Sequence, residues 1–328
     1  MSEFISTCSM FAAILFLIAG FAVLVKGADI FVEGSSSIAK RFHVPAIIIG
    51  LTIVAMGTSL PETAVSVVAA LQNKNTLAIS NVVGSNIFNM MVVIGVCAIL
   101  TPVAVQKATL KRDFPYSVFA ALLLLVLGGI GMKLGRIDSA VFLVFFAVFI
   151  GTMIHMATKA GKEGAAVQSE EIEAAEAQEI MSMPKSLLFL VIGVAGIILG
   201  GDMVVDSASN IALKVGMSQT LVGLTIVSVG TSLPELVTSV VAARKNEVDM
   251  ALGNAIGSNI FNILLVLGVA GVISPMPFLM ENIIDIGILI AFSLLIWIFA
   301  WTKEKISRKE GIVMVALYAI YVVYICVR

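Results

Sequence analysis

The sequence of 328 residues has few charged side chains, and this scarcity excludes most classes of water-soluble protein. Only 12% of the residues are charged, whereas 59% are hydrophobic and the mean hydropathy is +1.08. A chain of this composition exposes more apolar surface than water tolerates, and several of its apolar runs reach the length of a bilayer-spanning helix. The sequence therefore predicts a polytopic membrane protein.

The chain also lacks the residues from which several kinds of site are built. Its three cysteines, Cys8, Cys97 and Cys326, are widely separated, which favours neither a disulfide framework nor a thiolate metal site. The net charge of -1 comes without a basic stripe, which argues against nucleic acid as a partner. The first apolar run, from about Cys8 to Val25, is long for a signal peptide and lacks a clear cleavage site. We expect this run to remain as the first membrane helix.

Ten apolar segments are long enough to cross a membrane. They lie near residues 8–33, 44–71, 76–101, 114–132, 138–158, 186–210, 217–243, 249–273, 282–301 and 309–327. We therefore expect a first five-helix repeat in residues 1–158, an acidic cytoplasmic linker in 159–184 and a second five-helix repeat in 185–328. The linker is too short to form a core of its own. We interpret it as a plain linker that includes a short acidic helix, with a calcium-sensing or partner-binding segment as the alternative.

The two halves of the chain are copies of one another. Residues 50–95 align without a gap to residues 223–268, at a constant shift of 173 positions and with 27 of 46 pairs identical. An odd number of spans in each copy gives the two copies opposite orientations in the membrane. Of the 20 Lys and Arg residues, 14 fall on the side predicted to be inside and five on the other, so both termini are expected outside. The prediction is an all-α membrane protein of ten helices in two inverted repeats, the architecture of secondary transporters.

The hexapeptide GTSLPE occurs once in each half and places Glu62 and Glu235 near the middle of apolar spans. An unpaired charge at that depth costs at least about 2.5 to 3.5 kcal/mol. In the first copy Thr58 and Ser59 share a helix face with the glutamate, while Pro61 disrupts the helix and frees a backbone carbonyl. The second copy repeats the pattern with Thr231, Ser232 and Pro234. A group of hard oxygens without thiol or imidazole suits Na⁺ or Ca²⁺.

A second repeated motif, GSNIFN, lies on the next span of each half. Its first serine and last asparagine are four residues apart and face one way, which gives Ser85 and Asn89, then Ser258 and Asn262. Inversion of the repeats brings both copies to the centre, so the sequence predicts one cation site made of two halves. Gly84 and Gly257 are expected to let helices approach closely.

Other polar residues in the spans allow two interpretations. Asn81 and Asn254 fit hydrogen bonding between helices as well as a role in ion selection. Four acidic residues lie near span ends: Asp29, Glu33, Asp202 and Asp206. We expect them to be solvated or paired with Lys26, and this interpretation is favoured over an ion vestibule.

GTSLPE followed by GSNIFN, twice in inverted halves, resembles the calcium/cation antiporter superfamily and most of all its prokaryotic sodium/calcium exchanger branch. The resemblance covers nearly the whole chain. It implies a transporter that exchanges Ca²⁺ for Na⁺ by alternating access, with sliding first and sixth helices, in an inner or plasma membrane. The implied ligands are the side chains of Thr58, Ser59, Glu62, Ser85, Asn89, Thr231, Ser232, Glu235, Ser258 and Asn262, with carbonyls near Ala55 and Ser228. We expect no cofactor beyond the transported ions, lipid as the surroundings, and one copy to suffice for transport, with the oligomeric state open.

One position departs from the pattern of that branch. Asn262 stands where many sodium/calcium exchangers carry an aspartate. Two glutamates balance one Ca²⁺ or two Na⁺, and a third Na⁺ would leave uncompensated buried charge. The coupling ion therefore stays open: a Ca²⁺/H⁺ or other divalent cation antiporter is the main alternative, with a potassium-dependent exchanger and a cation channel as others. A hydrolase is disfavoured because Ser59 and Ser232 have no basic residue at matching spacing.

Overall fold

The computed structural model describes residues 5, 8–72, 76–171, 180–217 and 228–327, and most of these residues are helical. Within these ranges, eight helices are long and apolar enough to cross a membrane, and a bent pair of helices makes a ninth span if it is counted as one. The expected span near 217–243 includes residues 218–227, which lie outside the described ranges. The structure thus describes a multi-pass helical membrane protein, and the count of ten helices stays a prediction.

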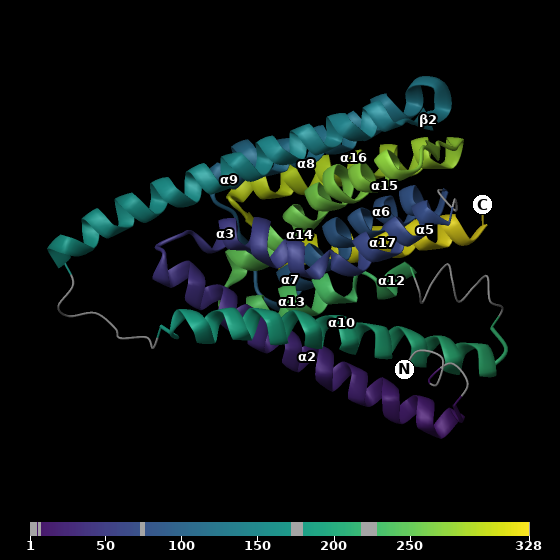
Figure 1. Ribbon diagram of the computed structural model, residues 1–328, viewed down its shortest axis with the longest axis horizontal. Coiled ribbons are helices and arrows are strands. Elements are labelled where there is room, and N and C mark those ends of the chain that lie inside the picture. The colour runs from purple at the N-terminus through teal and green to yellow at the C-terminus, as the bar shows by residue number, and fades with distance from the viewer. Residues whose placement is uncertain (1–4, 6–7, 73–75, 172–179, 218–227, 328) are drawn as a thin grey trace.

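The first half contains one long helix before, and one long helix after, a group of shorter ones (Figure 1). Its helical elements are α2 (Met10–Arg41), α3 (Ala46–Ile49), the π-helical turn η1 (Gly50–Val54), α4 (Ala55–Thr58), α5 (Leu60–Leu71), α6 (Thr76–Phe88), the π-helical turn η2 (Asn89–Val93), α7 (Ile94–Leu100), the π-helical turn η3 (Thr109–Asp113), α8 (Phe114–Gly129), the 3₁₀ turn η4 (Ile130–Met132) and α9 (Arg136–Glu171). Helix α9 extends past the other helices in Figure 1. Its last residues lie in the segment 159–184, where a short acidic helix was expected, so the membrane helix continues into this segment without a break.

The second half repeats this order of elements. Its helical elements are α10 (Met183–Lys214), α12 (Ser228–Gly230), α13 (Leu233–Arg244), α14 (Val248–Ile260), the π-helical turn η6 (Phe261–Val266), α15 (Leu267–Ile273), α16 (Met280–Lys303) and α17 (Arg308–Val327). Pro184 at the start of α10 and Pro234 at the start of α13 occupy first-turn positions, where a missing N–H costs no helical hydrogen bond.

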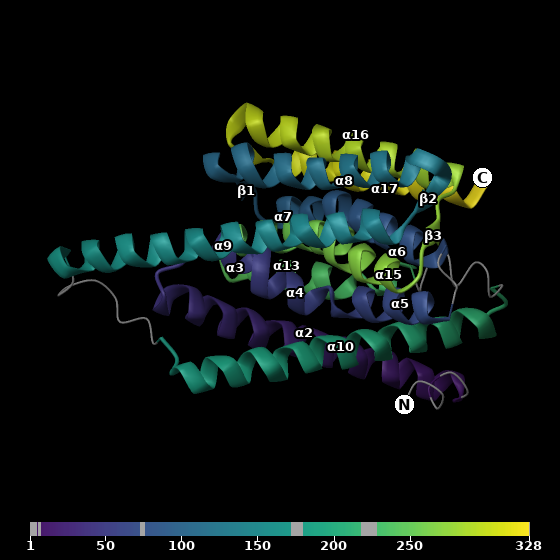
Figure 2. The ribbon, with the colours of Figure 1, turned by 45° about the horizontal axis from the view of Figure 1, so that its top comes forward.

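Two short antiparallel ladders join the halves at opposite ends of the bundle (Figure 2). Strand β1 (Val103–Ala104) pairs with β4 (Lys305–Ile306), and β2 (Lys133–Leu134) pairs with β3 (Met276–Pro277). Each ladder has two residues per strand, so the prediction of an all-α protein holds apart from these loop contacts.

Helices α2 and α10 lie along each other to one side of the remaining helices (Figures 1 and 2). Their contact is built on glycine. A Cβ atom added to Gly27 would lie 2.7 Å from the carbonyl carbon of Gly196, and one added to Gly193 would lie 2.6 Å from Cβ of Phe31. Because no side chain fits between the two backbones at these points, the helices approach more closely than larger residues would allow.

The segments that carry the GSNIFN motif form the centre of the bundle. In the most apolar window of Ala78–Leu100 and of Val248–Ile273, 78% of the residues are buried, against 17 to 39% in the other long spans. Helix α14 packs against η1 and α4, and Gly257 makes this possible, since an added Cβ would lie 2.8 Å from Cβ of Ala55. The expected close approach at Gly257 is confirmed.

We predict that Gly257→Val lowers the free energy of unfolding by about 1 to 3 kcal/mol, because the added atoms overlap Ala55 and the backbone of Leu51. The measurement is thermal or denaturant unfolding of the purified protein in detergent. Gly287→Val in α16 is the matched control, because an added Cβ there meets nothing within 4 Å. Equal losses in both variants would contradict this account of the interface.

Candidate cation site

Each GTSLPE motif lies at a break between two helices. In the first half α4 ends at Thr58, Ser59 has φ −83° and ψ 8°, and α5 begins at Leu60, so that the two parts bend by 48°. In the second half Ser232, with φ −95° and ψ 3°, precedes α13. Pro61 lies in the first turn of α5. The expected disruption by proline is confirmed, and it takes the form of a new helix start.

The glutamates of the two motifs lie in the first turns of α5 and α13, and both are completely buried. Glu62 Oε1 accepts a hydrogen bond from Ser85 Oγ at 3.5 Å, and Glu235 Oε1 accepts one from Ser59 Oγ at 3.3 Å. Among the described residues neither carboxylate has a Lys or Arg partner, and Oε2 of each has no hydrogen-bond partner. Buried carboxylates without a compensating positive charge are costly, so this place suits a cation.

The threonines of the motifs bind asparagines of the central helices. Thr58 Oγ1 donates to Oδ1 of Asn254 at 3.0 Å, and Thr231 Oγ1 donates to Oδ1 of Asn81 at 3.5 Å. The 173-residue shift converts the first pair into the second. Asn254 Nδ2 lies 3.3 Å from the backbone carbonyl of Glu235 and donates to it. For Asn254 the structure therefore supports hydrogen bonding between helices.

Two asparagines that sequence reasoning missed connect the halves at the centre of the bundle. Asn86 Nδ2 donates to the backbone carbonyl of Asn259 at 3.1 Å, and Asn259 Nδ2 donates to the backbone carbonyl of Asn86 at 3.2 Å. Both side chains are at most 1% exposed. They occupy the same place in the two GSNIFN copies, and this repetition of a buried amide was the signal that could have identified them.

The last asparagine of GSNIFN has a side-chain hydrogen bond in the second half of the chain, at Asn262, but not in the described contacts of the first half, at Asn89. Asn262 Nδ2 donates to Oδ1 of Asn86 at 3.1 Å, which leaves Asn262 Oδ1 buried and without a partner. Within the described part of the chain, neither amide atom of Asn89 has a hydrogen-bond partner, and Asn259 Oδ1 has none either. Asn89 begins the π-helical turn η2, and Asn262 is the second residue of η6. Single π-helical turns of this kind are frequent at functional sites.

Five of the predicted ligands have a buried side-chain oxygen without a hydrogen-bond partner among the described residues. These atoms are Glu62 Oε2, Glu235 Oε2, Ser232 Oγ, Asn89 Oδ1 and Asn262 Oδ1. An unsatisfied buried polar group costs about 1 to 3 kcal/mol, and Ca²⁺ binds carboxylate, amide and carbonyl oxygens. The donor set therefore fits a hard cation, and its role in ion binding stays a prediction.

Two of the remaining predicted ligands, Ser258 and Ala55, contact Thr58. Ser258 Oγ is 3.4 Å from Thr58 Oγ1. The carbonyl of Ala55 accepts hydrogen bonds from the N–H of Ser59 at 3.0 Å and from the hydroxyl of Thr58 at 3.3 Å. Ser228 begins α12, and its side chain lies outside the described part of the structure. Across the residues that are described, no group of three or more His, Cys, Asp or Glu side chains could hold a metal ion.

The acidic residues near the end of α2 form ion pairs at the surface. Asp29 lies 2.7 Å from Lys26 Nζ and 2.6 Å from Lys245 Nζ, and Glu33 lies 3.8 Å from Lys245 Nζ. Ser36 Oγ donates to Glu247 Oε1 at 2.5 Å. The expected pairing of Asp29 with Lys26 is confirmed, and the further contacts tie α2 to the loop between α13 and α14.

Comparison with known proteins finds relatives along nearly the whole chain. A family profile described as sodium/calcium exchanger protein matches residues 12–155 and 185–327. Sodium/calcium exchanger MaX1 of Methanosarcina acetivorans is 34% identical over 346 aligned positions, which cover 94% of this chain and 97% of MaX1. Inner membrane protein YrbG of Escherichia coli is 35% identical over 296 positions, which cover 88% of this chain and 90% of YrbG.

Among solved structures, the sodium-calcium exchanger NCX_Mj, soaked with Na⁺ and Sr²⁺, has a similar fold. The TM-score is 0.81 at 34% identity, over 96% of this chain and 99% of NCX_Mj. NCX_Mj has also been solved after soaking with Na⁺ and Ca²⁺.

The asymmetry around the central asparagines gives a prediction with an internal control. Asn86→Ala and Asn259→Ala each remove one bond from an amide to a backbone carbonyl, but only Asn86 also accepts a hydrogen bond from Asn262. We expect Asn86→Ala to lose about 1 to 3 kcal/mol more free energy of unfolding than Asn259→Ala, because it leaves an additional buried donor without a partner. Denaturant unfolding in detergent measures both variants, and equal losses would show that the bond to Asn262 contributes nothing.

Proposed function

The chain belongs to the sodium/calcium exchanger protein family, and on that basis we propose that it exchanges Ca²⁺ for Na⁺ across a membrane at a central site between its halves. The resemblance indicated by GTSLPE and GSNIFN is confirmed by the family match. A cation antiporter is the function that this family and the fold support, and such a protein is a transporter and not an enzyme.

The observation that carries the proposal is the pair of fully buried glutamates, one from each half. The two motifs meet, since Ser59, three residues before Glu62, donates to Glu235 Oε1 at 3.3 Å, and no basic side chain of the described residues pairs with either glutamate. Their mutual repulsion in a medium of low dielectric constant favours a bound cation. Two carboxylates balance one Ca²⁺ or two Na⁺, so the two ions compete for the same oxygens, which is what exchange requires.

We propose that all ligands implied by the motifs contribute oxygens to this site. In the first half these are Thr58, Ser59, Glu62, Ser85, Asn89 and the carbonyl of Ala55, and in the second Thr231, Ser232, Glu235, Ser258, Asn262 and the carbonyl of Ser228. The buried oxygens without partners support this assignment for five of the residues. A site shared by two halves changes its access when one half moves relative to the other, and this is how we account for alternating access.

We further propose ten spans in two inverted repeats, with both termini outside an inner or plasma membrane. In Figure 1, α2 begins and α17 ends at the same end of the bundle, whereas α9 ends and α10 begins at the opposite end. This arrangement supports an even number of crossings. The excess of Lys and Arg in the loops on the side of the linker supports an inside position for the linker.

The second candidate is a Ca²⁺/H⁺ or other divalent cation antiporter, and Asn262 is the observation that favours it. An amide at this position contributes no negative charge, and its N–H group is bound to Asn86. The site then has two carboxylates, which is one charge fewer than an aspartate at this position would give. Coupling to Na⁺ and coupling to H⁺ therefore have to be distinguished by measuring flux.

We expect purified protein in Na⁺-loaded liposomes to take up radioactive Ca²⁺ when the liposomes are diluted into Na⁺-free buffer with a proton ionophore present. Uptake that requires internal Na⁺ would establish sodium/calcium exchange. Uptake that ignores Na⁺ and follows a pH gradient once the ionophore is omitted would contradict it and favour the proton-coupled candidate. Flux that requires no counter-ion gradient would indicate a channel.

Glu62→Gln and Glu235→Gln serve as controls in the same assay. Each removes one of the two carboxylates and is expected to reduce Ca²⁺ affinity by at least about 100-fold, because loss of one charge from a buried cluster costs several kcal/mol. The variants have to insert and elute from a sizing column as the parent protein does. Normal uptake by either variant would overturn the assignment of the site.

We predict that Asn262→Asp changes both the charge moved per cycle and the preference between Ca²⁺ and Na⁺, because it adds a negative charge to the site. Asn89→Asp is the matched comparison, since it adds the same charge at the corresponding position, where the amide has no hydrogen bond to lose. We expect Asn262→Asp to cost about 1 to 3 kcal/mol more stability than Asn89→Asp, because an aspartate cannot donate to Asn86.

The measurement is uptake at imposed membrane potentials, together with unfolding in detergent. If current and ion selectivity of Asn262→Asp both equal those of the parent, Asn262 is not a ligand.

A further inference from the structure

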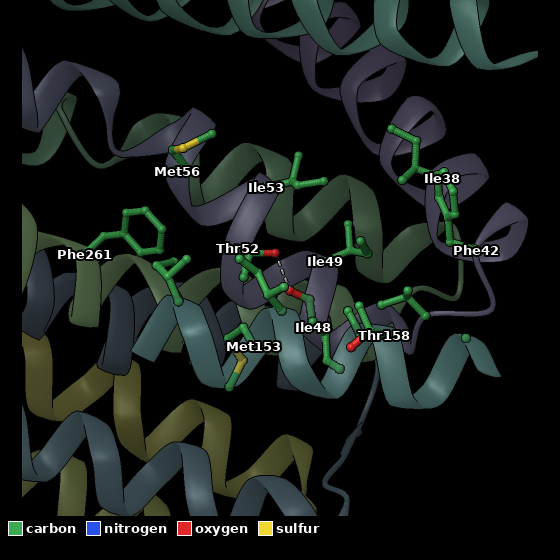
Figure 3. A pocket seen from close by; sticks show the side chains of 15 residues that line it. Ile38, Phe42, Ile48, Ile49, Thr52, Ile53, Met56, Met153, Thr158 and Phe261 are labelled. Atoms are coloured by element: carbon green, nitrogen blue, oxygen red, sulfur yellow. Dashed lines mark hydrogen bonds between the residues drawn. The ribbon is translucent and has the colours of Figure 1, made fainter. Parts of the chain in front are cut away.

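An apolar groove runs along the bundle between α9 and the first elements of the second predicted span. It has a volume of about 550 Å³, within the roughly 300 to 1,000 Å³ of ligand pockets in proteins. Figure 3 shows Ile48, Ile49 and Thr52 on one wall and Met153 and Thr158 on the facing wall. Phe42 and Ile38, from the end of α2, close one end of it, and Phe261 lies near the other end in the same view.

The groove offers nothing to a polar ligand. The two hydroxyl groups in its lining both donate to carbonyls of their own helices: Thr52 Oγ1 to Ile48 at 2.6 Å and Thr158 Oγ1 to His155 at 2.8 Å. Every other lining residue is apolar. The chemistry of the walls therefore selects hydrocarbon.

The groove is open to the bilayer. Met56 on α4 is 53% exposed and Ile154 on α9 is 59% exposed, and both side chains belong to its lining. These helices belong to the membrane-spanning part of the chain, so their exposed apolar side chains face lipid. An acyl chain can therefore enter from the side without crossing the protein.

Basic residues stand close in sequence to the lining residues at one end of the groove. At this end the helices touch, since a Cβ atom added to Gly161 would lie 2.9 Å from the carbonyl oxygen of Phe42. Within two residues of Phe42 and Gly161 in sequence stand four exposed basic residues: Lys40 and Arg41 at the end of α2, and Lys159 and Lys162 on α9. Arg41 also donates from Nη2 to the carbonyl of Met181 at 2.8 Å. Long basic side chains at the end of a membrane helix attract anionic lipid headgroups.

We propose that this groove binds one anionic phospholipid, with an acyl chain along the apolar walls and the phosphate among Lys40, Arg41, Lys159 and Lys162. The complementarity has two parts, because the walls accept hydrocarbon alone and four exposed basic residues lie within two positions of Phe42 and Gly161, the lining residues at the end where a headgroup would be. The lipid would pack behind η1 and Phe261, the segments directly before Ala55 and Asn262, and so support the backbone that positions both residues. The proposal holds whichever cation the protein carries.

Native mass spectrometry of the detergent-purified protein tests this proposal with two probes, phosphatidylglycerol and phosphatidylcholine. Ala157→Trp fills the groove, because Ala157 is a partly buried member of its lining. Val148→Trp is the control, because this residue is 55% exposed on α9 and is not part of the lining. We expect the parent and Val148→Trp to retain one more phosphatidylglycerol molecule than Ala157→Trp. We also expect the parent and Val148→Trp to retain much less phosphatidylcholine than phosphatidylglycerol.

A charge variant tests the headgroup separately and leaves the walls intact. Lys159→Gln with Lys162→Gln is expected to weaken retention of phosphatidylglycerol by about fivefold for each lysine removed, with little change for phosphatidylcholine. Equal retention of phosphatidylglycerol by Ala157→Trp and the parent would overturn the location of the site. Equal retention of the two lipids by the parent would overturn the anionic specificity.

Discussion

The structure depends on the cost of holding two carboxylates inside a membrane protein without a basic residue to neutralise them. Glu62 and Glu235 are completely buried, and among the described residues one oxygen of each accepts a serine hydroxyl hydrogen bond while the other has no partner. The broken helices follow from this requirement, because a helix start offers free N–H groups and a favourable dipole to a carboxylate in its first turn. The small residues of the central helices let the two halves approach closely, as the shared site that we propose requires.

The asparagine side chains of the two GSNIFN motifs form a hydrogen-bond network next to the candidate site, and this network is not symmetric. Asn86 and Asn259 bind each other's backbone carbonyls in a reciprocal arrangement, yet only Asn86 also holds the last asparagine of the opposite motif, Asn262. In the other half Asn89 has no partner for either amide atom. A transporter that opens to one side at a time has to differ between its halves in any single state, even when the halves share their sequence. In the alternating access that we propose, the two halves would exchange these arrangements.

The site and the bilayer are connected through the walls of the bundle. The π-helical turn η1 lines the apolar groove with one face and leads directly into α4, which carries Ala55 and Thr58. The ion pairs of Lys245 with Asp29 and Glu33 hold α2 against the loop between α13 and α14 at the surface. The proposed lipid and the contacts of α2 would therefore act on the elements that position the proposed cation ligands.

Much of this could be predicted from local properties of the sequence. Most apolar runs located the described helices to within a few residues, but α2 and α9 extend well past their expected ends at residues 33 and 158, and the span near 217–243 is only partly described. The glutamate with its neighbouring Pro61 predicted the break of the helix. The roles of Asn86 and Asn259 could not be predicted, because spacing along one helix does not reveal which carbonyl of a distant helix an amide will reach. Ladder contacts between the halves, such as Val103 with Ile306, depend in the same way on how the halves pack.

The sequence by itself determined that this is a duplicated, lipid-embedded chain with an acidic oxygen cluster in each half, because hydropathy, repetition and intrahelical spacing are one-dimensional properties. Only the tertiary structure decided that Ser59 binds Glu235, that Thr58 meets Ser258, and that Asn262 is held by Asn86 while Asn89 is not. These contacts join residues 176 to 200 positions apart. Their geometry depends on the packing of α4, α13 and α14 around glycines, and two copies of the same short motifs reach different hydrogen-bonded arrangements there because the residues around them differ.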